Sequence, residues 1–78
     1  MREVYIRLSS VDMVRAFVNT VDQLDGGFNL IAERRVLDAK SILGIFSLKL
    51  SNPLLLRIEK DTNENMTMLK DYIVQSED

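Results

Sequence analysis

The sequence predicts a single α+β domain over residues 1–78, an open-faced β-sandwich of order βαββαβα. Its sheet is expected to have four mainly antiparallel strands, with three helices on one face. Two observations predict this fold. Short segments in which every second residue is apolar are typical of half-buried strands, and they are separated by segments whose apolar residues recur every three or four positions, which is typical of helices. The length of 78 residues suits one hydrophobic core.

The first strand is predicted over residues 2–8, where the apolar residues Val4, Ile6 and Leu8 alternate with residues of the other face. Ser9 and Asp12 then have the spacing of a capping box, so a helix is expected to begin with Ser9 as its N-cap. Gly26-Gly27 is expected to end this helix, because glycine is common just beyond a helix C-terminus. The predicted helix presents one apolar stripe, formed by Val14, Phe17, Val18, Val21 and Leu24.

The middle of the chain predicts two further strands and a short helix. Residues 28–32 alternate as a second strand, and residues 35–38 form a short third strand after a turn at Glu33-Arg34. Residues 40–48 fit no single period well. Their length and the polar residues before them favour a helix of two turns, in which Gly44 allows close packing.

The end of the chain repeats the pattern of its beginning. Pro53 breaks the short helix, and residues 54–59 alternate as a fourth strand. Asp61 and Glu64 again have capping-box spacing and predict a third helix. Met66, Leu69 and Ile73 form its apolar stripe, and residues 75–78 form a polar tail. All the strand alternations and helix stripes are expected to point into one core.

Composition excludes several kinds of site. The chain contains no cysteine and no histidine, which excludes disulfides, thiol nucleophiles and imidazole chemistry. The acidic residues are scattered and form neither a positioned acid–base pair nor a calcium loop, so no metal, no cofactor and no enzymatic activity are expected. A net charge of −2 and the absence of a long apolar run predict a cytoplasmic protein that binds neither nucleic acid nor a membrane.

One segment carries a family resemblance. Residues 37–48, LDAKSILGIFSL, resemble the signature around the regulatory serine of HPr, the small phosphocarrier of the bacterial sugar phosphotransferase system. Residues 17–41 align with that family without a gap, including Val18-Asn19-Thr20 and Asn29-Leu30. The predicted order of elements is also that of the HPr domain. The resemblance therefore implies the HPr fold for nearly the whole chain.

The resemblance fails at the phosphocarrier site. HPr-like carriers have a histidine at the start of their first helix, and the gapless count back from Phe17 places Ser10 there. Asp12 takes the place of the family's arginine, which stabilises the phosphoryl group by charge-assisted hydrogen bonds. A serine phosphate ester is too stable to pass its group on, and Asp12 would repel it. No catalytic residue is therefore expected, and Ser10 is interpreted as a helix-capping hydroxyl.

The resemblance implies a regulatory site at Ser41. A serine at this place in the family is phosphorylated by a dedicated kinase, and here Lys40 provides an adjacent cation. The alternative is that Ser41 only caps the short helix. The family equivalents of Ile42, Leu43 and Phe46 form an apolar patch that docks partners. The alternative for these three residues is partial burial, although Ile45 and Leu48 can fill the core instead.

The sequence therefore predicts an HPr-like binding or regulatory module without phosphocarrier activity, controlled by phosphorylation at Ser41. Its expected partners are proteins that dock the patch around Lys40, Ile42, Leu43 and Phe46: a kinase, a transcriptional regulator, a metabolic enzyme or enzyme I. A monomer or a weak homodimer is expected. The alternative function is a sugar-transport component of the phosphotransferase system, a phosphocarrier by family that interacts with enzyme I. A third hypothesis is a structural or oligomerising remnant that is never phosphorylated.

Overall fold

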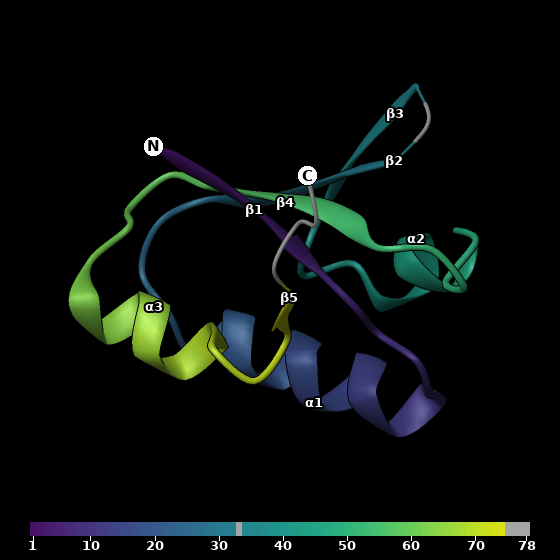
Figure 1. Ribbon diagram of the computed structural model, residues 1–78, viewed down its shortest axis with the longest axis horizontal. Helices are drawn as coiled ribbons and strands as arrows, with labels where there is room; N and C mark the ends of the chain where they lie inside the picture. The colour runs from purple at the N-terminus through teal and green to yellow at the C-terminus, as the bar shows by residue number, and fades with distance from the viewer. Residues whose placement is uncertain (33, 75–78) are drawn as a thin grey trace.

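The fold is α+β, as predicted (Figure 1), but the described residues form a sheet of five strands instead of four. The computed structural model describes residues 1–32 and 34–74. The predicted tail over residues 75–78 and one residue of the predicted turn, Glu33, lie outside the described residues. The elements are β1 (Arg2–Ile6), α1 (Val11–Asp22), β2 (Phe28–Ala32), β3 (Arg35–Asp38), α2 (Ile42–Phe46), β4 (Leu54–Ile58), α3 (Asn63–Leu69) and β5 (Ile73–Val74).

The strands pair in the order β3-β2-β4-β1-β5, and every pairing is antiparallel. Val4 lies opposite Leu56, and Leu56 lies opposite Leu30 on its other side. Leu30 in turn lies opposite Leu37. Because side chains directly opposite each other point to the same side of a sheet, this register gathers the alternating apolar residues of four strands on one face.

The core lies between that face of the sheet and the helices. Figure 1 shows α1 and α3 along one side of the sheet, with α2 near one end. Each buried large apolar side chain contributes about 1.5–3 kcal/mol through removal from water. The fully or almost fully buried apolar residues are Ile6, Leu8, Val14, Phe17, Val21, Phe28, Leu30, Ala39, Ile45, Leu54, Leu56, Ile58 and Leu69.

This core confirms the predicted strand alternations and the α1 stripe. Val14, Phe17 and Val21 of that stripe are buried, and Val18 and Leu24 pack against the core while partly exposed. In the predicted C-terminal stripe, Leu69 is buried, and Met66 and Ile73 are partly buried against the same cluster. The predicted alternations in the first and fourth strands likewise place their apolar residues in this core.

The prediction that Ile73 extends the C-terminal helix is wrong. The helix α3 ends at Leu69, and Ile73 belongs to β5, where it pairs with Ile6. The chain turns at Tyr72, whose ring packs edge-on against Phe17 with 5.3 Å between ring centroids. Ile73 and Val74 are β-branched residues, which favour strands, and they add to the free edge of β1. This short strand accounts for the fifth member of the sheet.

The two predicted capping boxes are each wrong by one residue, whereas the interpretation of Ser10 as a helix-capping hydroxyl is confirmed. Ser10, not Ser9, caps α1, and its hydroxyl oxygen accepts a hydrogen bond from Met13 N at 3.1 Å. Because Leu8 is fully buried beside the sheet, the chain stays extended past it and the helix begins later. Thr62, not Asp61, caps α3 through a bond from the backbone N–H of the third helical residue. Neither cap has the predicted capping-box carboxylate at that third position.

The predicted end of the first helix is also wrong. The helix α1 ends at Asp22 with Gln23 as its C-cap, four residues before Gly27. Gly26 instead turns the chain between α1 and β2 with φ of 94°, a left-handed conformation that favours glycine. A Cβ at Gly26 would also lie 3.0 Å from the Lys60 side chain. The glycine pair therefore shapes the loop into β2 and takes no part in capping the helix.

The account of the core predicts a large difference between two phenylalanine truncations. Phe17→Ala should reduce the free energy of unfolding by about 3–5 kcal/mol, because Phe17 is completely buried. Phe46→Ala is the matched control, since Phe46 is 40% exposed on α2, and it should cost less than about 1.5 kcal/mol. Urea denaturation measures both values. A cost below about 1 kcal/mol for Phe17→Ala would contradict this assignment of the core.

Candidate docking surface around Ser41

Ser41 is positioned by a short anchored segment between β3 and α2. Ala39 is buried, and its N–H donates to the Phe28 carbonyl at 2.9 Å, which ties the segment to β2. Asp38 then bends the chain, because its carboxylate accepts from Lys40 N at 2.9 Å and its carbonyl accepts from Ser41 N at 3.0 Å. Lys40 and Ser41 are thereby held outward, and both are exposed.

The Ser41 hydroxyl is the N-cap of α2. Its oxygen accepts a hydrogen bond from Gly44 N at 3.3 Å, with the extended backbone expected at a cap. The hydroxyl therefore has a structural role and is at the same time accessible from solvent. Ser41 therefore caps the short helix, as one of the two interpretations of the sequence expects. Its hydroxyl is still accessible to a modifying enzyme.

Gly44 is a close-packing point, as predicted. A Cβ at Gly44 would lie 3.1 Å from the Ser41 Oγ and 3.7 Å from a Leu37 methyl carbon. A side chain there would therefore press on the cap of α2. Glycine is the residue that leaves both the Ser41 hydroxyl and the Leu37 side chain undisturbed.

The apolar residues of α2 divide between the core and the surface. Ile45 is fully buried, and Leu48 is partly buried, as predicted for the inward side of the short helix. Leu43 is 81% exposed and Phe46 is 40% exposed, while Ile42 is partly buried against the core. We call Lys40, Ile42, Leu43 and Phe46 the docking surface; Ile42 forms its partly buried border with the core.

The predicted helix is shorter than expected, because α2 spans only residues 42–46. At the end of this helix, the Ser47 hydroxyl donates a hydrogen bond to the Gly44 carbonyl at 2.6 Å. A helix of this length has room to bury few side chains, and within residues 1–32 and 34–74 Leu43 stays largely exposed. The short helix accounts for the high exposure of Leu43.

Ser10 lies at the start of α1, a helix that packs against α2. Both Ser10 and Asp12 are exposed. The Ser10 hydroxyl is engaged as the cap of α1, and the acidic residue in the first turn is Asp12. The position that the family resemblance assigns to histidine is therefore a helix cap with a carboxylate close by.

The docking surface is not a pocket. A hollow of about 610 Å³ is lined by residues that include Tyr5, Arg35 and Lys49, but no residue of the docking surface lines it. Among residues 1–32 and 34–74, no group of three or more acidic, histidine or cysteine side chains could hold a metal ion. A surface with exposed apolar side chains that line no pocket suits contact with another macromolecule better than enclosure of a small molecule.

None of the helices that the structure describes is long and apolar enough to cross a lipid bilayer. Comparisons with protein-family models, with curated proteins and with solved structures give no match. The resemblance to HPr therefore depends on the motif around Ser41 and on the order of the elements.

Sequence reasoning missed one buried polar residue, Asn65 of α3. Its side chain is 2% exposed, and its amide group donates to the Asp25 carbonyl at 3.1 Å and to the Lys60 carbonyl at 2.9 Å. These bonds join the start of α3 to the loops before β2 and after β4. No sequence signal distinguishes Asn65 from a surface asparagine, because its partners are backbone carbonyls and one of them, that of Asp25, lies 40 residues away along the chain.

The cap geometry predicts unequal effects of two neighbouring serines. Ser10→Ala should lower the free energy of unfolding by about 1 kcal/mol, because the amide of Met13 loses its acceptor. Ser9→Ala is the matched control and should change it by less than about 0.5 kcal/mol, because the Ser9 hydroxyl only approaches the Met13 sulfur. Thermal and urea unfolding measure both. A larger loss for Ser9→Ala would restore Ser9 as the cap.

Proposed function

We propose that this chain is an HPr-like binding or regulatory module without phosphocarrier activity, controlled by phosphorylation at Ser41. One observation carries the proposal: an accessible serine hydroxyl stands at the start of a short helix whose outward apolar side chains are uncovered. The order of the first seven elements, βαββαβα, supports the family resemblance. The fifth strand, β5, is an addition to the expected pattern.

The docking surface has the character of a protein-binding site. Leu43 and Phe46 are exposed. A partner that buries them would gain about 25 cal/mol of binding free energy for each Å² of apolar surface removed from water. Aromatic residues beside other apolar side chains are frequent anchors in protein interfaces. The adjacent Lys40 favours a partner with an acidic rim. A kinase, a transcriptional regulator or a metabolic enzyme fits this description.

Phosphorylation of Ser41 would change this surface without reaching the core. A phosphate adds a charge of about −1.5 to −2 at a position two residues from Leu43. A partner that buries Leu43 and Phe46 would have to desolvate that charge, whereas a partner with arginines would gain from it. The modification would therefore select between partners, and the buried side of α2 would stay as it is.

Ser10 is unsuited to carry a phosphoryl group. A carrier needs a labile phosphorus bond, and a serine ester is stable. A phosphate on Ser10 would also add its negative charge close to Asp12 in the first turn of α1. A regulatory role is therefore better supported than transport of phosphoryl groups from enzyme I.

The test uses Ser41→Asp, which adds a charge and keeps a capping oxygen. Aspartate is as good an N-cap as serine, so the melting temperature should stay within about 2 °C of the parent protein. The parent protein, Ser41→Asp and Phe46→Ala are each immobilised and exposed to native lysate. The proteins that each one retains are then quantified. The proposal predicts one common set of proteins that Phe46→Ala loses and that Ser41→Asp loses or exchanges.

Met68→Ala is the matched control, since Met68 is an exposed apolar residue on α3, outside the docking surface, and it should retain that set. Two results would overturn the proposal. One is a Ser41→Asp protein that folds normally and retains the same partners as the parent. The other is stoichiometric, acid-labile label from enzyme I and phosphoenolpyruvate that passes on to a sugar-specific acceptor, which is the expectation of the transport alternative.

A further inference from the structure

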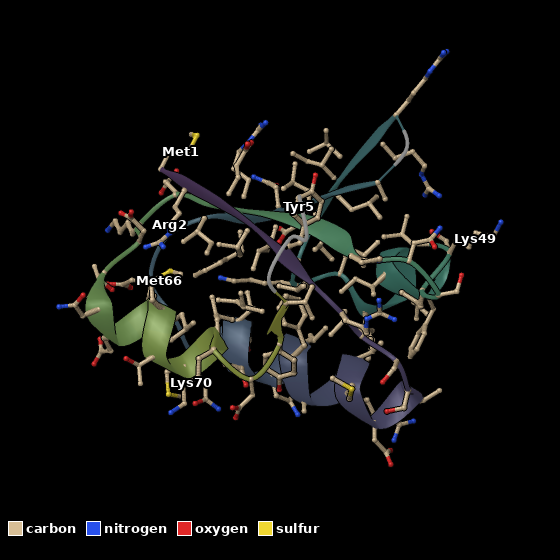
Figure 2. All side chains as sticks on the ribbon, viewed as in Figure 1. Met1, Arg2, Tyr5, Lys49, Met66 and Lys70 are labelled. Atoms are coloured by element: carbon tan, nitrogen blue, oxygen red, sulfur yellow. The ribbon has the colours of Figure 1, made fainter. Side chains whose placement is uncertain are left out.

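A continuous apolar row crosses the sheet on the face opposite the core. The pairing register places Tyr5 opposite both Leu55 and Val74, and places Ile31 opposite both Leu55 and Val36. Figure 2 shows Tyr5 on the side of the sheet away from α1 and α3. Val36 is 61% exposed and Tyr5 is 44% exposed, and the other three residues are partly buried. We call Tyr5, Ile31, Val36, Leu55 and Val74 the apolar row.

Opposite charges flank the apolar row at its two sides. Toward the start of β1 the next row contains Glu3, Arg57, Asn29 and Asp38. Arg57 is bound to Glu3 at 2.9 Å, so Asp38 leaves this row with a net charge of −1. Toward the end of β1 the chain carries Arg7, and Arg34 stands in the turn before β3. Lys49 adds a cation at the same end, where it lines the hollow together with Tyr5 and Leu55.

We propose that the apolar row is the interface of a homodimer, in which two sheets pack face to face around a two-fold axis that runs along the row. Sheets packed in this way lie about 10 Å apart with their side chains interdigitated. Under this axis each residue of the row meets its own counterpart. The acidic end of one copy then lies over the basic end of the other, with Asp38 facing Arg34 and the Glu3–Arg57 ion pair facing Arg7.

The charge distribution selects both the occupant and the axis. A second copy covers the apolar row and at the same time places opposite charges over both of its charged ends. This is the property of a self-complementary two-fold interface. A two-fold axis along the strands would place acidic ends on acidic ends, and like charges in contact oppose association. The charges on the two sides of the apolar row therefore favour one relative orientation of the two copies.

The expected affinity is modest. Five strands spaced about 4.8 Å apart and three rows of side chains give a footprint of roughly 500 Å² per copy in projection. This is below the roughly 800 Å² per partner of a standard interface, so we expect a dimer that dissociates in the micromolar range. Such a dimer would leave α2 uncovered on each copy and would present two docking surfaces to a partner.

Sedimentation velocity between about 10 µM and about 1 mM tests the proposal. The parent protein should shift from monomer to dimer across this range. Val36→Lys and Val36→Glu should each stay monomeric, because like charges would meet on the axis. An equimolar mixture of the two should dimerise again, since the opposite charges then face each other. Val11→Lys is the matched control, an equally exposed valine on α1 (54% exposed), and it should dimerise like the parent.

Far-ultraviolet circular dichroism and thermal unfolding confirm that each variant is folded before sedimentation. A parent protein that remains monomeric at about 1 mM would overturn the proposal. Folded Val36→Lys protein that still dimerises would exclude the apolar row as the interface. Two singly monomeric variants whose mixture also stays monomeric would exclude the two-fold axis along the row.

Discussion

The burial of one face of the sheet is the constraint on which the rest of this structure depends. The registers of β1, β4 and β2 place Val4, Leu56 and Leu30 side by side, and α1 closes over them with Phe17. In a chain of 78 residues this single apolar layer is the main source of stability. A shift of one residue in any of these strands would turn its apolar side chains to the opposite face.

Because one face of the sheet is buried, other surfaces of the molecule are free to bind partners. The helix α2 contributes one fully buried residue, Ile45, and so its outward residues can vary in charge or bind partners with little effect on the core. None of the helices in the described part of the chain lies over the opposite face of the sheet (Figure 1). The two proposed interfaces, the docking surface and the apolar row, lie on parts of the fold that the core does not need.

The sequence predicted the elements that depend on local periodicity. The strands over residues 28–32 and 35–38 and the stripe through Phe17 are strong local patterns, and the structure has them at those places. The N-caps at Ser10 and Thr62 were missed by one residue, because adjacent polar residues offer equivalent caps and burial of the preceding chain decides between them. The strand β5 was missed because Ile73 also fits a helical period.

The candidate site was predictable only in part. The motif located Ser41 and the apolar residues of α2, but their exposure depends on the short length of that helix, which sequence periodicity did not reveal. The apolar row had a visible signal, since Tyr5, Ile31 and Leu55 occupy strand positions where a solvated face would carry polar residues. Its continuity depends on the register between strands that are distant in sequence, and therefore required the structure.

Stability resides in the sheet and α1, while α2 presents its outer side independently. Native-state amide hydrogen exchange tests this most directly, because it measures the free energy of opening at each residue. We predict that amides of β1, β2 and β4 exchange only through global unfolding, and that the amide of Ile45, bonded to the Ser41 carbonyl, exchanges through a local opening of clearly lower free energy. Equal protection of Ile45 and of Leu56 in β4 would contradict the account, since α2 would then be an inseparable part of the core.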